Sequence, residues 1–266
     1  MKTHLKKYGT TALIVGGSEG IGKAFAEYLA ASGLHLILIA RNKEKLENAA
    51  NELTDKYKIN IDYYSYDLAK PESIQSIVKL IETADIHIFV YNAAISHIGA
   101  FKAKSSEFYN SMTTANINAP LQLTHKVLEQ MEVRQKGAII LLSSLAGFQG
   151  SGNVSAYAAT KAFNLNLAEG LWYEYKDSGI DILACCPGAT SSPNYLRTKP
   201  NKMGFFSPKI LSPTEVVTEA FQNLGKKPSI ITGFGNRMVS ILMHRLLPRK
   251  QSVKIMGDAT TKLYDL

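Results

Sequence analysis

The chain has 266 residues, of which 45% are hydrophobic and 20% charged, so it is neither disordered nor fibrous, and its length suits one large domain. The net charge of +8 is unevenly placed: the segment from Ala220 to Gly257 contains seven basic residues and no acidic one. The rest of the chain is nearly neutral, which argues against a general surface for polyanions such as nucleic acids.

The two cysteines, Cys185 and Cys186, are adjacent in an apolar run, which fits neither a disulfide framework nor a metal-binding spacing. We therefore expect a reducing, cytoplasmic setting and no metal site. The apolar stretch near the start, Ala12 to Val15, is too short for the core of a signal peptide. No run approaches the ~18 apolar residues that a membrane-spanning helix needs.

Short runs rich in leucine and β-branched residues alternate with long segments of helical periodicity. We predict strands at 11–15, 35–40, 61–66, 87–91, 138–143, 180–186 and 229–232. Strands separated by helix-length connections indicate an α/β fold, a doubly wound, seven-stranded parallel sheet with helices on both faces. Between the first two strands, Phe25 and Leu29 lie on one apolar stripe of a helix that begins at Gly20.

A glycine-rich turn, VGGSEGIG from Val15 to Gly22, lies between the first strand and the first helix. Gly16 permits a sharp turn off the strand, Gly20 lets the backbone approach a pyrophosphate, and Gly22 allows the helix to pack closely on the sheet. The free amides of the helix N-terminus then face the anion. The glycines alone are weak grounds for this assignment, because a tight turn can need them for structural reasons.

The G-x-x-x-G-x-G spacing of this turn resembles that of the short-chain dehydrogenase/reductase family. The rest of the chain offers the family's other motifs in order, over residues 8 to about 232: Asp67, Asn92–Ala93–Ala94, Asn116, Ser144, Tyr157 with Lys161, and Pro187–Gly188. Departures are confined to supporting positions: Val15 where Thr is usual, Tyr91 and Ala94 around Asn92–Ala93, and Ser192 where Thr is common. The resemblance implies a Rossmann-like fold and an oxidoreductase that acts on CH–OH groups with a nicotinamide cofactor.

The predicted catalytic residues are Asn116, Ser144, Tyr157 and Lys161. Tyr157 and Lys161 are four residues apart on one helix and share a face, so we expect the ammonium to lower the pKa of the phenol. Tyr157 would donate a proton to a ketone oxygen during reduction, and Ser144 would hydrogen-bond the same oxygen. By resemblance, Asn116 helps to hold Lys161 and a water that relays protons. In isolation, Tyr157 is more typical of a half-buried aromatic on an amphipathic helix, but Ser144 thirteen residues earlier, as in the family, favours the catalytic interpretation.

The second strand ends in Ala40–Arg41–Asn42, without the acid that would bind a ribose diol. Because a guanidinium suits a phosphate, we predict NADP rather than NAD, with Arg41 as the discriminating residue and Ser18 as a second contact. The alternative is a solvated Arg at a helix start. The predicted cofactor-binding residues are Gly16, Ser18, Gly20, Ile21, Gly22, Arg41, Asp67, Leu68, Asn92, Ala93, Tyr157, Lys161, Pro187, Gly188, Thr190 and Ser192. Asp67 is also typical of a helix cap.

An irregular stretch at about 189–213 is predicted to be a lid, although an ordinary surface excursion is the alternative. With 96–101 and 145–154 it supplies largely uncharged pocket walls, including Ile98, Phe101, Phe148, Tyr195 and Phe206, which favour a bulky apolar ketone or secondary alcohol. His97 is expected to be structural or a pocket wall.

The glycine motif, Lys7–Tyr8–Gly9 before it, and the tail residues Ile255–Met256–Gly257 and Tyr264–Asp265 are similar to those of bacterial 7β-hydroxysteroid dehydrogenases. The tail is also similar to uncharacterised bacterial members of the family. The resemblance suggests a hydroxysteroid as substrate. The alternatives are a 3-oxoacyl (fatty acyl) reductase and a non-catalytic NADP-binding sensor; the intact set of four catalytic residues argues against the sensor.

We treat residues 1–266 as one domain with a basic helical extension at about 234–266. From Phe234 to Pro248 the pattern predicts an amphipathic helix, with apolar residues at helical spacing between Arg237 and Arg245. Such a helix packs on its own domain, on a partner subunit or on an anionic membrane, and we favour the first two because they are commoner. The family's habit implies a homodimer or homotetramer.

Overall fold

The computed structural model describes residues 3–201 and 209–266, and its centre is a seven-stranded parallel sheet. The strands lie in the order β3-β2-β1-β4-β5-β6-β7, which confirms the predicted fold class. Their bounds agree with the predicted runs to within one residue at each end: β1 Thr11–Val15, β2 His35–Ala40, β3 Ile61–Ser65, β4 Ile88–Tyr91, β5 Gly137–Leu142, β6 Ile180–Cys186 and β7 Ser229–Ile231.

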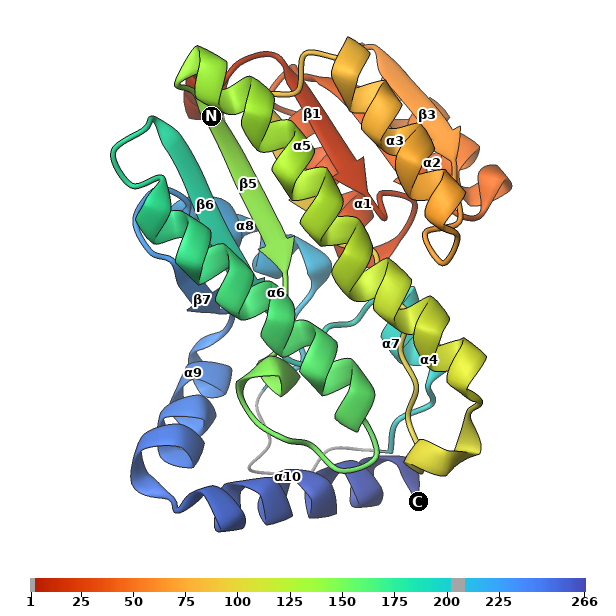
Figure 1. The fold of residues 1–266 in the computed structure, drawn as a ribbon, viewed down its shortest axis with the longest axis vertical. Helices are drawn as coiled ribbons and strands as arrows, with labels where there is room; N and C mark the ends of the chain where they lie inside the picture. The colour runs from red at the N-terminus through yellow and green to blue at the C-terminus, as the bar shows by residue number, and fades with distance from the viewer. Residues whose placement is uncertain (1–2, 202–208) are drawn as a thin grey trace.

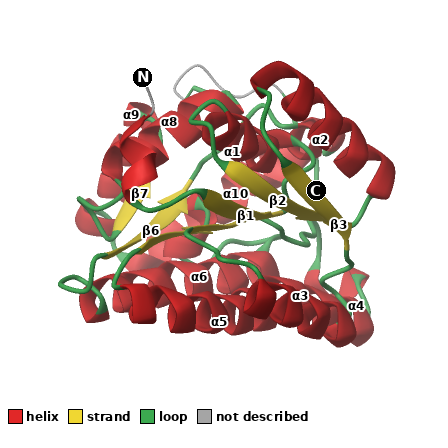
Figure 2. Cartoon of the chain, turned by 90° about the horizontal axis from the view of Figure 1, so that it is seen from above, coloured by secondary structure: helices red, strands yellow, loops and turns green. Residues whose placement is uncertain are grey.

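Helices cover both faces of the sheet, as Figures 1 and 2 show. One face packs against α1 (Gly20–Ala30), α2 (Lys43–Tyr57) and α8 (Pro213–Asn223), the other against α3 (Pro71–Thr83), α5 (Ala119–Arg134) and α6 (Ser155–Glu174). Neighbours in β1 point to opposite faces, so Ile14 joins the first core and Leu13 the second. Burial on both sides explains why the strands are continuous apolar runs.

The side of β1 on which successive strands are added changes between β3 and β4. From β1 the chain moves outward to β2 and β3, and β4 then returns to the other side of β1. Ligands of open α/β sheets bind at such a switch point, outside the carboxyl ends of the strands. The predicted residues Gly16, Arg41, Asn92, Ser144 and Pro187 each follow a strand at this edge.

The remaining helices lie at the same edge or beyond it: α4 (Ser106–Thr113), α7 (Pro193–Arg197), α9 (Phe234–Ile241) and α10 (Arg249–Tyr264). The tail is not one helix, because a π-helical turn over Leu242–Leu246 and Pro248 separate α9 from α10. In Figure 1, α10 crosses beneath the carboxyl ends of the strands, from α9 to the region of α4. Among the described residues, no helix has the length and apolar content to cross a bilayer.

Candidate active site

The glycine turn after β1 forms a close-packed cradle. Gly16 has a φ of +90°, and a Cβ on it would lie 2.7 Å from the backbone nitrogen of Ala93. A Cβ on Gly22 would lie 1.8 Å from the carbonyl oxygen of Gly16, so the start of α1 can approach the turn only with glycine there. The Asn92 side chain donates a 3.0 Å hydrogen bond to the same oxygen. The turn therefore leaves room for backbone contact with a phosphate group.

Arg41, the residue predicted to distinguish NADP from NAD, lies near this turn. Arg41 follows β2, is exposed, and makes no ion pair with any residue that the structure describes. Its strand is tied to the turn, since the amide of Gly16 donates a 2.6 Å hydrogen bond to the Ile39 carbonyl. Ser18 and Ile21, in the turn and in α1, are half-buried. The residues therefore fit a dinucleotide cofactor.

Two further predicted contacts lie after β3. Asp67 accepts a 3.1 Å hydrogen bond from the amide of Ala69, so its carboxylate stabilises the turn before α3. The helix-cap alternative for Asp67 is wrong, because the N-cap residue of α3 is Lys70 and no side chain caps that helix. The adjacent Leu68 is buried.

The segment after β6 leads from the core to the lid. Pro187 accepts a 2.9 Å hydrogen bond from the amide of Leu145, and a Cβ on Gly188 would lie within 2.6 Å of the Asn236 side chain. Thr190 is buried and pairs with Leu211. Ser192 caps α7, accepting from the amide of Tyr195 at 3.3 Å, so its hydroxyl has a structural partner. Of the lid, residues 202–208, including Phe206, lie outside the described residues.

Glu19 joins the glycine turn to the lid. Its carboxylate forms an ion pair with Arg197 at the end of α7 and lies 2.9 Å from the ammonium of Lys45. The hydrogen bond from Arg197, then that from Lys45, lowers the pKa of Glu19 to about 2 against the effect of its burial. A Cβ on Gly20 would lie 3.0 Å from Cβ of Ser192, so the lid touches the turn directly.

Ser144, Tyr157 and Lys161 converge at the end of β5. Ser144 caps a short 3-10 helix, Leu145–Phe148, and its hydroxyl hydrogen-bonds with Tyr157. The ammonium of Lys161 lies 5.7 Å from the centroid of the Tyr157 ring and donates a 2.7 Å hydrogen bond to the Leu142 carbonyl. The backbone of Lys161 is held by the hydroxyl of Ser143, 2.7 Å from its carbonyl. Ser144 and Tyr157 can therefore act on one oxygen atom, with the Lys161 ammonium held near the Tyr157 ring.

Asn116 lies buried in a π-helical turn, Thr114–Asn118, between α4 and α5. Its side chain accepts from the amide of Ile95 and donates to the carbonyl of Ile95, both at 2.8 Å. It also donates to Thr160, the residue before Lys161, at 3.0 Å. Asn116 thus ties the segment after β4 to α6, and none of these three hydrogen bonds reaches the Lys161 ammonium. π-Helical turns occur often at functional sites.

The pKa of Tyr157 differs from our expectation. Burial raises it to about 12, the hydrogen bond with Ser144 opposes this, and Tyr264 adds to it. Burial also lowers the pKa of Lys161 to about 8. The sequence pattern correctly predicted a shared helix face but not the desolvation, which is the largest cause of both pKa shifts.

The C-terminal helix contributes a contact that the sequence analysis missed. Thr261 of α10 accepts a 2.9 Å hydrogen bond from Asn153, which lies in the loop between Ser144 and Tyr157. The same loop packs closely on α10, since a Cβ on Gly152 would lie 3.3 Å from Cα of Gly257. Tyr264, at the end of α10, raises the pKa of both Tyr157 and Tyr195. Because only the fold places residue 264 beside residue 157, spacing could not have identified it.

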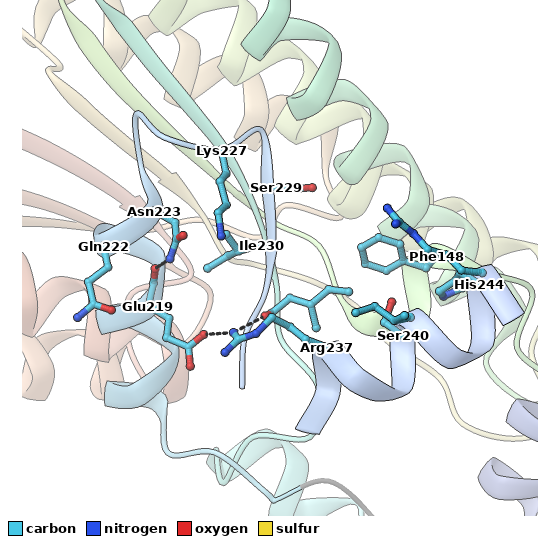
Figure 3. Close-up of a pocket in the computed structure, with 13 residues that line it drawn as sticks. Phe148, Glu219, Gln222, Asn223, Lys227, Ser229, Ile230, Arg237, Ser240 and His244 are labelled. Carbon is cyan, nitrogen blue, oxygen red and sulfur yellow. Dashed lines mark hydrogen bonds and ion pairs between the residues drawn. The ribbon is translucent and has the colours of Figure 1, made fainter. Parts of the chain in front are cut away.

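Two cavities bear on the predicted pocket walls. A small one, of about 10 Å³, borders Tyr157 and includes His97 and Phe101. A larger one, of about 730 Å³, lies at the β7 edge beneath α9 (Figure 3) and contains none of the predicted catalytic residues. Phe148 lines the larger cavity, its ring 5.5 Å from that of His244, and not the cavity beside Tyr157.

Comparison with known proteins identifies the family. The family model for short chain dehydrogenases matches residues 10–202. This chain belongs to the short-chain dehydrogenase family. It is 32% identical over 234 residues to a 7β-hydroxysteroid dehydrogenase of Collinsella aerofaciens, covering 87% of this chain and 89% of that protein. It is 30% identical to the human inactive hydroxysteroid dehydrogenase-like protein 1, covering 92% and 74% of the two chains.

Two solved structures share the fold over most of the chain. That of a 7β-hydroxysteroid dehydrogenase has a TM-score of 0.88 and 28% identity, covering 94% of this chain and 98% of that one. That of a short-chain dehydrogenase of Sphingobium yanoikuyae in complex with NADPH has a TM-score of 0.75 and 31% identity, covering 84% and 87%. The chain is thus an oxidoreductase-family member related to 7β-hydroxysteroid dehydrogenases.

Proposed function

We propose that the protein is an NADP(H)-dependent oxidoreductase that interconverts a secondary alcohol and a ketone on a bulky apolar substrate, a hydroxysteroid being the leading candidate. The observation that carries the proposal is the meeting of Ser144, Tyr157 and Lys161 at the edge of the sheet that also carries the glycine turn. A bound NADPH supplies the hydride for reduction.

The protein's own residues supply the proton and hold the oxygen. In the reductive direction the Tyr157 phenol, protonated because its pKa is about 12, donates its proton to the ketone oxygen. Ser144 donates a hydrogen bond to the same oxygen as charge develops on it. Lys161 is held in place by the Leu142 carbonyl, and Asn116 fixes the backbone and side chains around it.

The preference for NADP rests on Arg41. Its guanidinium is exposed, is free of ion pairs within the described residues and follows the strand beside the glycine turn, where a phosphate on the adenosine ribose would lie. The relative in complex with NADPH supports the same choice.

The substrate class rests on apolar side chains and on the relatives. Phe101 and Val154 line the small cavity beside Tyr157, and Tyr195 lies near Tyr264 at the lid. The hydroxysteroid assignment is supported by the Collinsella aerofaciens relative and by the TM-score of 0.88. A 3-oxoacyl reductase, which would use the same chemistry, is one alternative. A non-catalytic NADP-binding sensor is the other, and the human relative named as inactive is the observation that favours it.

We propose a cytoplasmic setting, where the buried free thiols of Cys185 and Cys186 and an NADPH-dependent reaction both fit. We also propose a homodimer or homotetramer. Leu121, Val133 and Tyr173 are large apolar side chains exposed on α5 and α6, and they offer a face for a second copy.

The decisive experiment compares kcat/KM for NADPH oxidation across three ketone classes: keto-steroids and other bulky ketones, 3-oxoacyl thioesters, and ketose sugars. The proposal expects the bulky ketones to be the best substrates and NADPH to be preferred over NADH. Activity confined to sugars would overturn the substrate class, and best activity on acyl thioesters would select the alternative reductase.

A further inference from the structure

On α9 and the turn after it, polar side chains are buried and large apolar side chains are exposed, which is the opposite of an ordinary surface helix. Asn236 and Ser240 are 3% and 7% exposed, whereas Phe234 and Leu246 are 72% and 70% exposed. Between them, Met238, Ile241 and Leu242 are also exposed. The spacing of Phe234, Met238, Ile241 and Arg245 puts them on one exposed stripe, whose last two members also border the cavity at the β7 edge. A stripe of this composition marks an interaction surface.

Most charged side chains near the stripe and at the start of α10 are cations. Arg237 is paired with Glu219 at 2.7 Å. Arg245, Arg249, Lys250 and Lys254 are exposed and form no ion pair within the described residues. The cavity beneath α9 adds Lys227, and Figure 3 shows this side chain and Arg237 at that cavity. A partner must therefore accept apolar side chains and supply negative charge.

We propose that the face formed by Phe234, Met238, Ile241, Leu242 and Leu246, with Arg245, Arg249, Lys250 and Lys254 around it, docks on an anionic lipid surface. Apolar side chains enter the boundary between headgroups and acyl chains, and the cations bind the headgroup phosphates. The occupant is a lipid surface and not a second copy, because a symmetric pairing would bring the same four cations against each other.

A second copy of the chain could instead bind the exposed apolar side chains of α5. Val133, 87% exposed, lies with Leu121 on α5, on the opposite side of the sheet from α1 and α8. Docking through α9 also suits the position of the site: in Figure 1, α9 and α10 lie toward the end of the molecule where the strands have their carboxyl ends. An apolar substrate dissolved in a bilayer would then reach the protein on the side of its site.

The test is flotation of the full chain with two kinds of vesicle, phosphatidylcholine alone and phosphatidylcholine mixed with phosphatidylglycerol, at low and high salt. We expect binding to the mixed vesicles at low salt, reduced at high salt and weak on phosphatidylcholine alone. The double variant Arg245→Glu/Lys250→Glu should weaken partitioning more than tenfold, since each cation near the surface contributes about a fivefold factor. Phe234→Ser/Leu246→Ser should weaken it about tenfold or more.

Matched controls lie on other faces. Lys79→Glu on α3 and Val133→Ser on α5 remove an exposed cation and an exposed apolar side chain, and both should bind vesicles like the unchanged protein. Circular dichroism and NADPH binding check that each variant folds. Absence of flotation by the unchanged protein would overturn the proposal, as would equal binding to both vesicle types. Loss of oligomers in Phe234→Ser/Leu246→Ser without any vesicle binding would assign the face to a second copy instead.

Discussion

The ammonium nitrogen of Lys161 donates a 2.7 Å hydrogen bond to the carbonyl oxygen of Leu142, the last residue of β5. This bond holds a buried cation at the end of the strand that carries Ser144. Burial makes its ionised form costly, which is why its pKa falls to about 8. The charge state of Lys161 therefore changes within the pH range in which the enzyme can be assayed.

The first prediction concerns pH and stability. The folded pKa of Lys161, about 8, lies below its ordinary value of 10.5, so between these pH values the folded state binds fewer protons than the unfolded state. Burial of the charged Lys161 therefore lowers the free energy of unfolding below pH 8, and this penalty shrinks as the pH rises from 8 toward 10.5. Urea unfolding at several pH values, for the unchanged protein and Lys161→Met, should show that the variant lacks this upward trend. Identical trends would contradict the assignment.

The second prediction concerns the cofactor. Arg41→Ala should raise the KM for NADPH about 10- to 100-fold, because a charge-assisted hydrogen bond to a phosphate is lost, and should leave the KM for NADH nearly unchanged. Lys79→Ala, another exposed cation removed from the site, is the control and should affect neither. Equal losses with both cofactors would show that Arg41 does not contact the additional phosphate.

The third prediction concerns the lid. Glu19→Gln removes the carboxylate that pairs with Arg197, and we expect NADPH to dissociate up to about fivefold faster, since an exposed ion pair contributes at most about 1 kcal/mol. Glu52→Gln, which removes the exposed ion pair with Lys23 elsewhere on the surface, serves as the control. Stopped-flow measurement of NADPH release distinguishes them, and unchanged release in Glu19→Gln would refute a role for the pair in holding the lid.

The fourth prediction concerns the C-terminal helix. Thr261→Val preserves the side-chain shape but deletes the acceptor of the Asn153 hydrogen bond, so α10 loses a contact with the loop before Tyr157. The KM for the ketone should change about fivefold, the value of one lost hydrogen bond, while the KM for NADPH stays constant. Thr83→Val, at the exposed end of α3, controls for the substitution itself.

Much of this architecture could be predicted because its signals are local. Runs such as Leu36–Ile39 are buried on both faces and are recognised as strands, and Gly22 is required by a contact with Gly16 within the same turn. The contacts of Glu19 with Arg197 and of Asn153 with Thr261 could not, because they join residues far apart in the sequence. The predicted end of the first tail helix at Pro248 agrees with the start of α10 at Arg249, but the π-helical turn over Leu242–Leu246 escaped the pattern, since it keeps nearly the same apolar spacing as an α-helix.

The most direct test of the account is the rate of NADPH oxidation with a bulky ketone by the unchanged protein and by Tyr157→Phe, with NADPH binding measured in both. The account predicts turnover by the unchanged protein, a loss of about 10²- to 10⁴-fold in kcat for the variant, and equal NADPH binding by the two. The opposite result, an unchanged kcat in Tyr157→Phe or no ketone turnover by a protein that binds NADPH, would contradict it.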